Sequence, residues 1–142
     1  MKAANPYLNF NGNTEEAFSF YRSVFGGEFP MIMRFKDTPE AAKVPADVQD
    51  KVMHIALPLG KNNMLMATDA CESMGFSLTS GNNMSICISA DSEAEAGKLF
   101  DGLSAGGKIL VPLAKQSWGD LFGQVADKFG IQWMIDYSEN HQ

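Results

Sequence analysis

The sequence predicts an α+β fold made of two copies of one unit, each with the order strand, helix, strand, strand, strand. A helix signal with the same side-chain pattern occurs twice, 79 residues apart, and short extended segments flank both copies. Such self-similarity indicates that a structural unit is repeated. The chain has 142 residues, about the length of one ordinary domain, so we expect both copies to form a single domain, residues 1–142.

The first helix is predicted to begin after Asn13 and to end before two glycines. Asn13 is a residue type that caps helices, and Glu16 three residues later completes a capping-box pattern. The apolar residues that share one face of this helix are Ala17, Phe20, Tyr21, Val24 and Phe25. Gly26 and Gly27 then end it, because glycine readily adopts the backbone conformation that follows a helix.

The second helix repeats this pattern. Ser92 takes the place of Asn13, and Glu95 takes the place of Glu16. The matching apolar residues are Ala96, Leu99, Phe100 and Leu103, followed by Gly106 and Gly107.

One short strand precedes each predicted helix, and three follow it. The strands are predicted at residues 7–10, 28–35, 52–59 and 63–68 in the first module, and at residues 84–89, 108–113, 121–125 and 131–137 in the second. Two prolines in residues 37–50 indicate a loop there. Residues 71–83, rich in Ser, Gly and Asn, are predicted to link module one, about residues 1–70, to module two, about residues 84–138.

Alternation along the strands predicts which face of each sheet a helix covers. In segment 52–59 one side is continuously apolar, with Met53, Ile55, Leu57 and Leu59, and His54 falls on the other side. Ser85 and Cys87 are assigned to that same side in segment 84–89. We therefore expect curved mixed sheets with the helices on their outer faces and an inner cup that includes His54, Ser85 and Cys87.

Composition and charge restrict the partners. The formal net charge is −6, from 17 acidic and 11 basic residues without a basic cluster, which argues against nucleic acid as a partner. No apolar run approaches the roughly 20 residues that span a membrane, and the first residues lack the apolar core of a secretion signal. Two cysteines are too few for a disulfide framework. We expect a reduced, cytoplasmic protein with neither a nucleic-acid nor a membrane partner.

Three stretches of the chain carry motifs of a known family. They are Pro6-Tyr7-Leu8-Asn9-Phe10-Asn11-Gly12-Asn13 with the helix that follows, Met64-Leu65-Met66-Ala67-Thr68-Asp69-Ala70, and the run from Trp118-Gly119 through Phe122-Gly123 and Asp127-Lys128-Phe129-Gly130 to Trp133-Met134-Ile135. With the two tandem βαβββ modules, they resemble the PhnB-like branch of the vicinal oxygen chelate superfamily. That superfamily includes glyoxalase I, ring-cleaving dioxygenases and bleomycin-resistance proteins. The resemblance implies a cup formed by paired modules and a homodimer.

The resemblance also implies four positions at which metal-dependent members hold a His, Gln or Glu ligand. In this sequence they fall at Pro6 or Tyr7, at Met64–Met66, at Ser85 or Ile86, and at Trp133–Ile135. None of these side chains is a usual ligand of zinc, iron or magnesium. We therefore expect no catalytic metal and no other cofactor.

Members of this branch are often labelled as similar to a demethylubiquinone methyltransferase. Nucleotide-type cofactor sites require a glycine-rich loop that follows a strand and opens a helix. No such loop is present, and Gly26 and Gly27 are predicted to end a helix instead.

The candidate ligand-binding residues are His54, Ser85, Cys87, Trp118, Phe122 and Trp133. His54 is either a polar group in the cup or a hydrogen-bonded histidine of the sheet. Cys87 is either a small apolar residue or the partner of His54 in a nucleophile pair. Trp118 is either a lid over a ligand or the anchor of its loop, and Trp133 either stacks on a ligand or packs in the core. Asp69 and Asp127 are interpreted as turn or cap residues.

The predicted function is that of a small-molecule binding protein of the glyoxalase and bleomycin-resistance type, with an apolar cup and no catalytic metal. The alternative is an enzyme of the same superfamily, an isomerase, lyase or dioxygenase, that acts without metal or binds metal at positions shifted from those above. A fold by itself does not choose between these functions.

Overall fold

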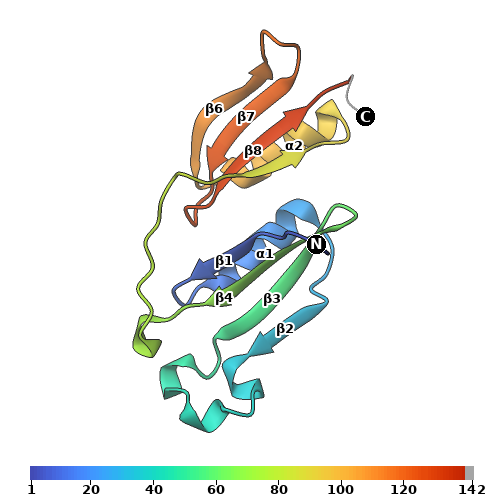
Figure 1. Ribbon diagram of the computed structural model, residues 1–142. Helices are drawn as coiled ribbons and strands as arrows, with labels where there is room; N and C mark the ends of the chain where they lie inside the picture. The colour runs from blue at the N-terminus through green and yellow to red at the C-terminus, as the bar shows by residue number, and fades with distance from the viewer. Residues whose placement is uncertain (140–142) are drawn as a thin grey trace. The chain divides into compact units, whose positions relative to one another are not determined.

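The computed structural model describes residues 1–139 and confirms the α+β fold (Figure 1). The chain forms two compact units, one of residues 1–79 and one that begins at residue 80. Each unit contains a four-stranded mixed sheet and one α-helix. No helix among the described residues is long and apolar enough to cross a membrane.

The first unit has the predicted order of elements. It consists of β1 (Tyr7–Phe10), α1 (Thr14–Phe25), β2 (Met31–Arg34), β3 (Val52–Leu59) and β4 (Asn63–Asp69). The strand order in the sheet is β1-β4-β3-β2, with β1 parallel to β4 and the other pairs antiparallel. The helix α1 packs on β3 and β4.

The second unit repeats this topology. It consists of β5 (Ile86–Ser89), α2 (Glu93–Ser104), β6 (Lys108–Lys115), β7 (Leu121–Ala126) and β8 (Gln132–Tyr137), in the sheet order β5-β8-β7-β6. The bounds of β5 and α2 both lie 79 residues after those of β1 and α1. The predicted repeat is therefore confirmed, and the second helix packs on β6, β7 and β8.

The segment between β2 and β3 is more ordered than the predicted loop. It contains three short 3-10 helices, η1 (Phe35–Asp37), η2 (Ala41–Lys43) and η3 (Ala46–Val48). A fourth, η4 (Glu72–Met74), lies outside this segment, after β4. Phe35, Val48 and Cys71 form a small buried cluster, against which Val44, Met53 and Met74 pack. These apolar contacts give the segment a core of its own, which local proline and charge content do not reveal.

The alternation along β3 is confirmed in part. Ile55 and Leu57 are fully buried, whereas His54 is only partly buried and Pro58 is exposed. Val52 and Ala56 are exceptions, because they share the parity of His54 and are nevertheless only 1% and 6% exposed. Met53, on the apolar side, is only partly buried and packs against the cluster of Phe35, Val48 and Cys71.

Two expectations about α1 are wrong. The Asn13 side chain forms no capping hydrogen bond, and the Asp69 carboxylate at the end of β4 accepts one from the Thr14 N–H instead. Phe18, outside the predicted stripe, is fully buried, whereas Phe20 is only partly buried. In α2 the expected cap is confirmed, since Ser92 Oγ accepts a hydrogen bond from the Glu95 N–H at 3.0 Å.

Candidate functional site

The face of the first sheet that α1 leaves uncovered carries four of the nine methionines. The strand register places Tyr7, Met66, Ala56 and Met31 side by side across all four strands. In the next row Asn9 pairs with Thr68 and His54 pairs with Met33. Met64 pairs with Pro58 on the other side of the first row. We call this surface, residues Tyr7, Asn9, Met31, Met33, His54, Ala56, Pro58, Met64, Met66 and Thr68, the methionine face.

The sequence produces this face through strict alternation in β1 and β4. Leu8, Phe10, Leu65 and Ala67 are buried on the helix side, whereas their neighbours Tyr7 and Asn9 are exposed and Met64, Met66 and Thr68 are partly buried. Met66 and Met31 flank Ala56 directly in the register, which accounts for the burial of this small residue. Flexible thioether side chains can adapt to ligands of different shape.

Tyr7 and His54 form a polar contact on the methionine face. The Tyr7 hydroxyl lies 3.1 Å from His54 Nδ1, and the two ring centroids are 5.7 Å apart. Because β4 lies between β1 and β3, this contact spans one intervening strand. Tyr7 is exposed as a whole, but partial desolvation raises the pKa of its phenol above the ordinary value.

The open face of the second sheet is also of mixed character. In the register Cys87, Met134, Gln124 and Val111 form one row, and Ser89, Asp136, Phe122 and Ala114 form the next. Cys87 Sγ lies 3.7 Å from Asp136 Oδ2. Burial and the nearby Asp136 carboxylate both raise the pKa of the Cys87 thiol, which disfavours the reactive thiolate.

The structure divides the predicted ligand-binding residues between the two units. His54 lies on the methionine face of the first unit, and the other five belong to the second. Cys87 and Phe122 lie on the open face of the second sheet, and Ser85 is half-buried immediately before β5. Trp118, in the connection between β6 and β7, is 64% exposed, and its ring centroid lies 6.4 Å from that of Phe122.

Trp133 lies on the helix side of its sheet and is fully buried. Its Nε1–H donates to Asp127 Oδ2 at 2.9 Å. The other oxygen of Asp127 accepts from the backbone N–H groups of Phe129 and Ile131, so the interpretation of Asp127 as a turn residue is confirmed. Trp133 fixes the turn between β7 and β8 to the core, away from the open face, and is not part of the candidate site.

A separate hollow of about 400 Å³ lies beside the β6–β7 connection. Its lining includes Glu93, Lys115, Trp118, Asp120 and Tyr137. Tyr137 alternates with Asp136 along β8 and therefore faces the helix side, so this hollow is distinct from the open face.

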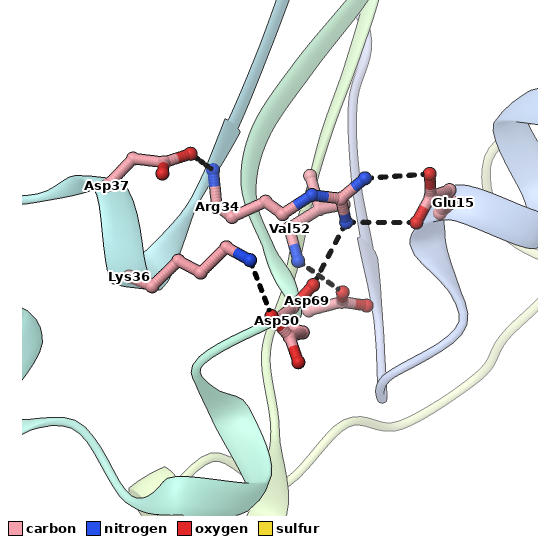
Figure 2. A network of polar contacts seen from close by, with 7 residues as sticks. All are labelled: Glu15, Arg34, Lys36, Asp37, Asp50, Val52 and Asp69. Carbon is pink, nitrogen blue, oxygen red and sulfur yellow. Dashed lines mark hydrogen bonds and ion pairs between the residues drawn. The ribbon is translucent and has the colours of Figure 1, made fainter.

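A further hollow, in the first unit, is lined mainly by charged side chains. Figure 2 shows the network of polar contacts that several of these side chains form. Arg34, at the end of β2, makes two hydrogen bonds of 2.9 and 2.8 Å with the Glu15 carboxylate on the first turn of α1. Its guanidinium also donates to the Asp50 carbonyl oxygen at 2.9 Å, and Lys36 pairs with the Asp50 carboxylate at 2.8 Å. These groups satisfy one another, so the cluster ties α1 to the β2–β3 segment rather than presenting unpaired charge.

Within residues 1–139, no three side chains of His, Cys, Asp or Glu lie close enough together to hold a metal ion. The four positions that the resemblance relates to metal ligands carry the side chains already named, with Tyr7 and Met66 paired on the methionine face. The expectation of no catalytic metal stays a prediction.

Sequence reasoning missed most of the methionine face. From the sequence, Tyr7, Met64 and Met66 stand only at positions related to metal ligands, and no pattern assigns Met31 and Met33 to a face. Tyr7, Met64 and Met66 can be found from the alternation of buried and less buried residues along segments 7–10 and 63–68. The strand order is also needed, because it alone places β1 and β2 at opposite edges of one sheet.

Comparison with known proteins gives a family match over nearly the whole chain. A family model described as 3-demethylubiquinone-9 3-methyltransferase matches residues 2–136. Protein YjdN of Escherichia coli (strain K12) is 27% identical over 140 residues, covering 93% of this chain and 92% of that protein.

Solved structures share the fold. Protein PA1353 from Pseudomonas aeruginosa is 38% identical with a TM-score of 0.82, and the match covers 95% of this chain and 96% of that one. A putative 3-demethylubiquinone-9 3-methyltransferase, PhnB protein, from Bacillus cereus is 28% identical with a TM-score of 0.73, over 95% and 98% of the chains. A glyoxalase/bleomycin resistance protein/dioxygenase family enzyme from Burkholderia phytofirmans PsJN has the same fold at 21% identity, with a TM-score of 0.61 over 94% and 98% of the chains.

Proposed function

Because this chain belongs to the family described as 3-demethylubiquinone-9 3-methyltransferase, a PhnB-like branch of the glyoxalase/bleomycin resistance/dioxygenase superfamily, we propose that it is a small-molecule binding protein. The ligand is mainly apolar and lies on the methionine face. One observation carries this proposal, namely the clustering of four methionines around Ala56 on a sheet face that α1 does not cover.

The residue types on the methionine face support the proposal that it binds a ligand and does not serve only to pack against other parts of the protein. Small-molecule sites are lined mainly by apolar and aromatic side chains, with a few polar groups that fix orientation. Here Met31, Met33, Met64 and Met66 supply the apolar lining, and the Tyr7–His54 pair supplies the polar groups. Met31 and Tyr7 remain 45% and 46% exposed, so the unit leaves apolar surface open for contact.

Methyl transfer is not part of the proposal. The two connections from a strand to a following helix, residues 11–13 and 90–92, contain one glycine, Gly12. A nucleotide-type cofactor is held by a glycine-rich loop at that position. We therefore propose binding without a nucleotide-type cofactor, and the side chains at the four positions related to metal ligands support binding without a catalytic metal.

The proposal includes a homodimer in a reducing, cytoplasmic environment. Each sheet ends in two edge strands, and β2 and β6 expose Met31, Ile32, Ile109 and Leu110. Edge strands need cover, and two-fold dimers are the commonest oligomers. Both Cys71 and Cys87 are free thiols. Light scattering should give twice the chain mass of 15.5 kDa, and a stable monomer at micromolar concentration would refute the dimer.

Titration with the apolar dye phenylnaphthylamine tests the proposed function. We expect saturable binding, and we expect Met66→Gln to raise the dissociation constant roughly fivefold. The substitution puts a polar amide in place of a thioether whose apolar contact with the dye contributes about 1 kcal/mol. Met84→Gln is the matched control, since Met84 is 68% exposed and lies outside both sheets. Dye binding that does not saturate, or that is unchanged in Met66→Gln, would contradict the proposal. Mass spectrometry of any co-purified small molecule would identify the natural ligand.

A further inference from the structure

The direction of the Tyr7–His54 hydrogen bond determines what His54 offers to a ligand. The two atoms in contact are the Tyr7 hydroxyl oxygen and His54 Nδ1, at 3.1 Å. A phenol O–H is a stronger hydrogen-bond donor than the N–H of a neutral imidazole, and an unprotonated imidazole nitrogen is a stronger acceptor than a phenol oxygen, so the favoured arrangement has Tyr7 donating to Nδ1. Nδ1 is then the acceptor, and the neutral ring carries its proton on Nε2.

Two neighbouring rows of the methionine face differ in character, one being mostly polar and the other mostly apolar. The polar row holds Asn9 and Thr68, which pair in the register, and His54, which pairs with Met33 at the edge. Continuing the β3–β4 register by one residue beyond Ile55 and Ala67 puts Thr68 opposite His54. The adjacent row contains Met66, Ala56 and Met31. A ligand that covers both rows must therefore have a polar end and an apolar body.

The polar row contains hydrogen-bond donors and no carboxylate. The nearest acidic residue in β4, Asp69, points to the other face, where Oδ1 accepts from Thr14 and Oδ2 accepts from the Val52 N–H at 2.8 Å. None of the residues of the methionine face is acidic, so the face itself offers no carboxylate to a cation. The amide of Asn9, the hydroxyl of Thr68 and an imidazole N–H are all suited to a ligand oxygen.

We propose that the ligand of the methionine face is an amphipathic molecule whose polar end is a hydrogen-bond-accepting oxygen, a carbonyl or a carboxylate, that receives the Nε2–H of His54. Its apolar body lies over Met66 and Met31. This inference rests on the proposed function of the same face and adds the chemical class of the ligand. Tyr7 acts as a positioning residue, because it fixes the tautomer of His54.

Three probe molecules with similar phenylalkyl groups but different polar groups test which chemical class of ligand binds. Phenylbutyrate carries a carboxylate, benzylacetone a carbonyl and phenylbutylamine an ammonium group. In displacement of phenylnaphthylamine, we expect both oxygen ligands to bind at least tenfold more tightly than the amine. His54→Phe should abolish this preference while the dye still binds, and His54→Gln, which keeps an N–H donor, should restore part of it.

The tautomer of His54 provides a test that needs no ligand. NMR of the imidazole nitrogens in the intact protein should show the proton of neutral His54 on Nε2. Tyr7→Phe should convert this single form into a mixture, because it removes the hydroxyl that occupies Nδ1. A proton on Nδ1 in the unsubstituted protein would overturn the inference.

The outcomes separate this inference from the proposed function. If the dye binds and the three ligands bind equally, or the amine binds most tightly, the inference is overturned and the proposed function stands. If neither the dye nor any of the three ligands binds, the proposed function is overturned and the inference falls with it. A preference for the oxygen ligands that survives in His54→Phe would also overturn the role of His54.

Discussion

The carboxylate of Asp69 caps the helix that begins at Thr14, 55 residues earlier in the chain. Asp69 Oδ1 accepts hydrogen bonds from the Thr14 N–H at 3.0 Å and from the Thr14 hydroxyl at 2.6 Å. Its second oxygen accepts from the Val52 N–H, so one buried side chain joins α1, β3 and β4. This contact fixes the start of α1 against the sheet whose opposite face carries the candidate site.

Removing the Asp69 carboxylate should destabilise the first unit. Asp69→Ala leaves the N–H groups of Thr14 and Val52 without this acceptor, and an unsatisfied buried donor costs about 1–3 kcal/mol. We expect a loss of about 2–4 kcal/mol in the free energy of unfolding, measured by urea titration with circular dichroism. Asp47→Ala, at an exposed position, is the control and should change stability by less than about 0.5 kcal/mol. Equal effects of both substitutions would contradict the capping role.

The two tryptophans should differ sharply in their contribution to stability. Trp133→Phe removes the hydrogen bond to Asp127 and part of a fully buried ring, and we expect it to cost about 2–3 kcal/mol. Trp118→Phe, at a position that is 64% exposed, should cost less than about 0.5 kcal/mol. Thermal unfolding followed by circular dichroism measures both. The remaining tryptophan in Trp133→Phe should be readily quenched by acrylamide, and protection of Trp118 from the quencher would contradict its exposure.

The Glu15–Arg34 pair should make stability depend on pH. The hydrogen bonds from Arg34 hold the pKa of Glu15 below its ordinary value of 4.5. A lowered pKa in the folded state means that the pair stabilises the protein above about pH 4.5 and that this contribution is lost as the pH falls through the lower, folded-state value. The difference in unfolding free energy between the natural protein and Arg34→Ala should therefore shrink below that pH. A difference that stays constant from neutral to acidic pH would show that Arg34 acts through packing.

Cys87 should react slowly with alkylating reagents although the residue as a whole is exposed. Partial burial of its thiol and the nearby Asp136 carboxylate both raise the thiol pKa, so little thiolate is present at neutral pH. We expect Asp136→Asn to increase the rate of alkylation by iodoacetamide at neutral pH several-fold. The measurement uses a Cys71→Ala background, so that Cys87 is the one thiol followed. An unchanged rate in Asp136→Asn would leave burial as the sole cause of the slow reaction.

The purified protein should carry no stoichiometric zinc, iron, nickel or manganese. Tyr7 and Met66, which stand at two of the positions that the family resemblance relates to metal ligands, are not usual ligands of these ions. Elemental analysis after purification without a histidine tag measures the metal content directly. One tightly bound ion per chain would contradict this prediction, and a loss of that ion in His54→Ala would place it on the methionine face.

Local sequence alone determined the repeated architecture of this protein. The spacing of apolar residues, the Ser92 cap and the paired glycines predict two helices that differ in length by one residue, and the structure gives 12 residues for each. Alternation likewise predicts that Ile55 and Leu57 are buried and that His54 is on the other face. These features depend on backbone periodicity and on neighbours a few residues away, so a short window of sequence contains the information.

Only the tertiary structure decided which residues meet across the sheets. Tyr7 and His54 are 47 residues apart, and they come together because the strand order and register place β1 and β3 on either side of β4. The same order gathers four methionines from two strands, β2 and β4, onto one face, and it brings Asp69 to α1 in place of the locally favoured Asn13. Strand order and register result from the packing of the whole unit, and a change of one residue in register would move each of these side chains to the opposite face.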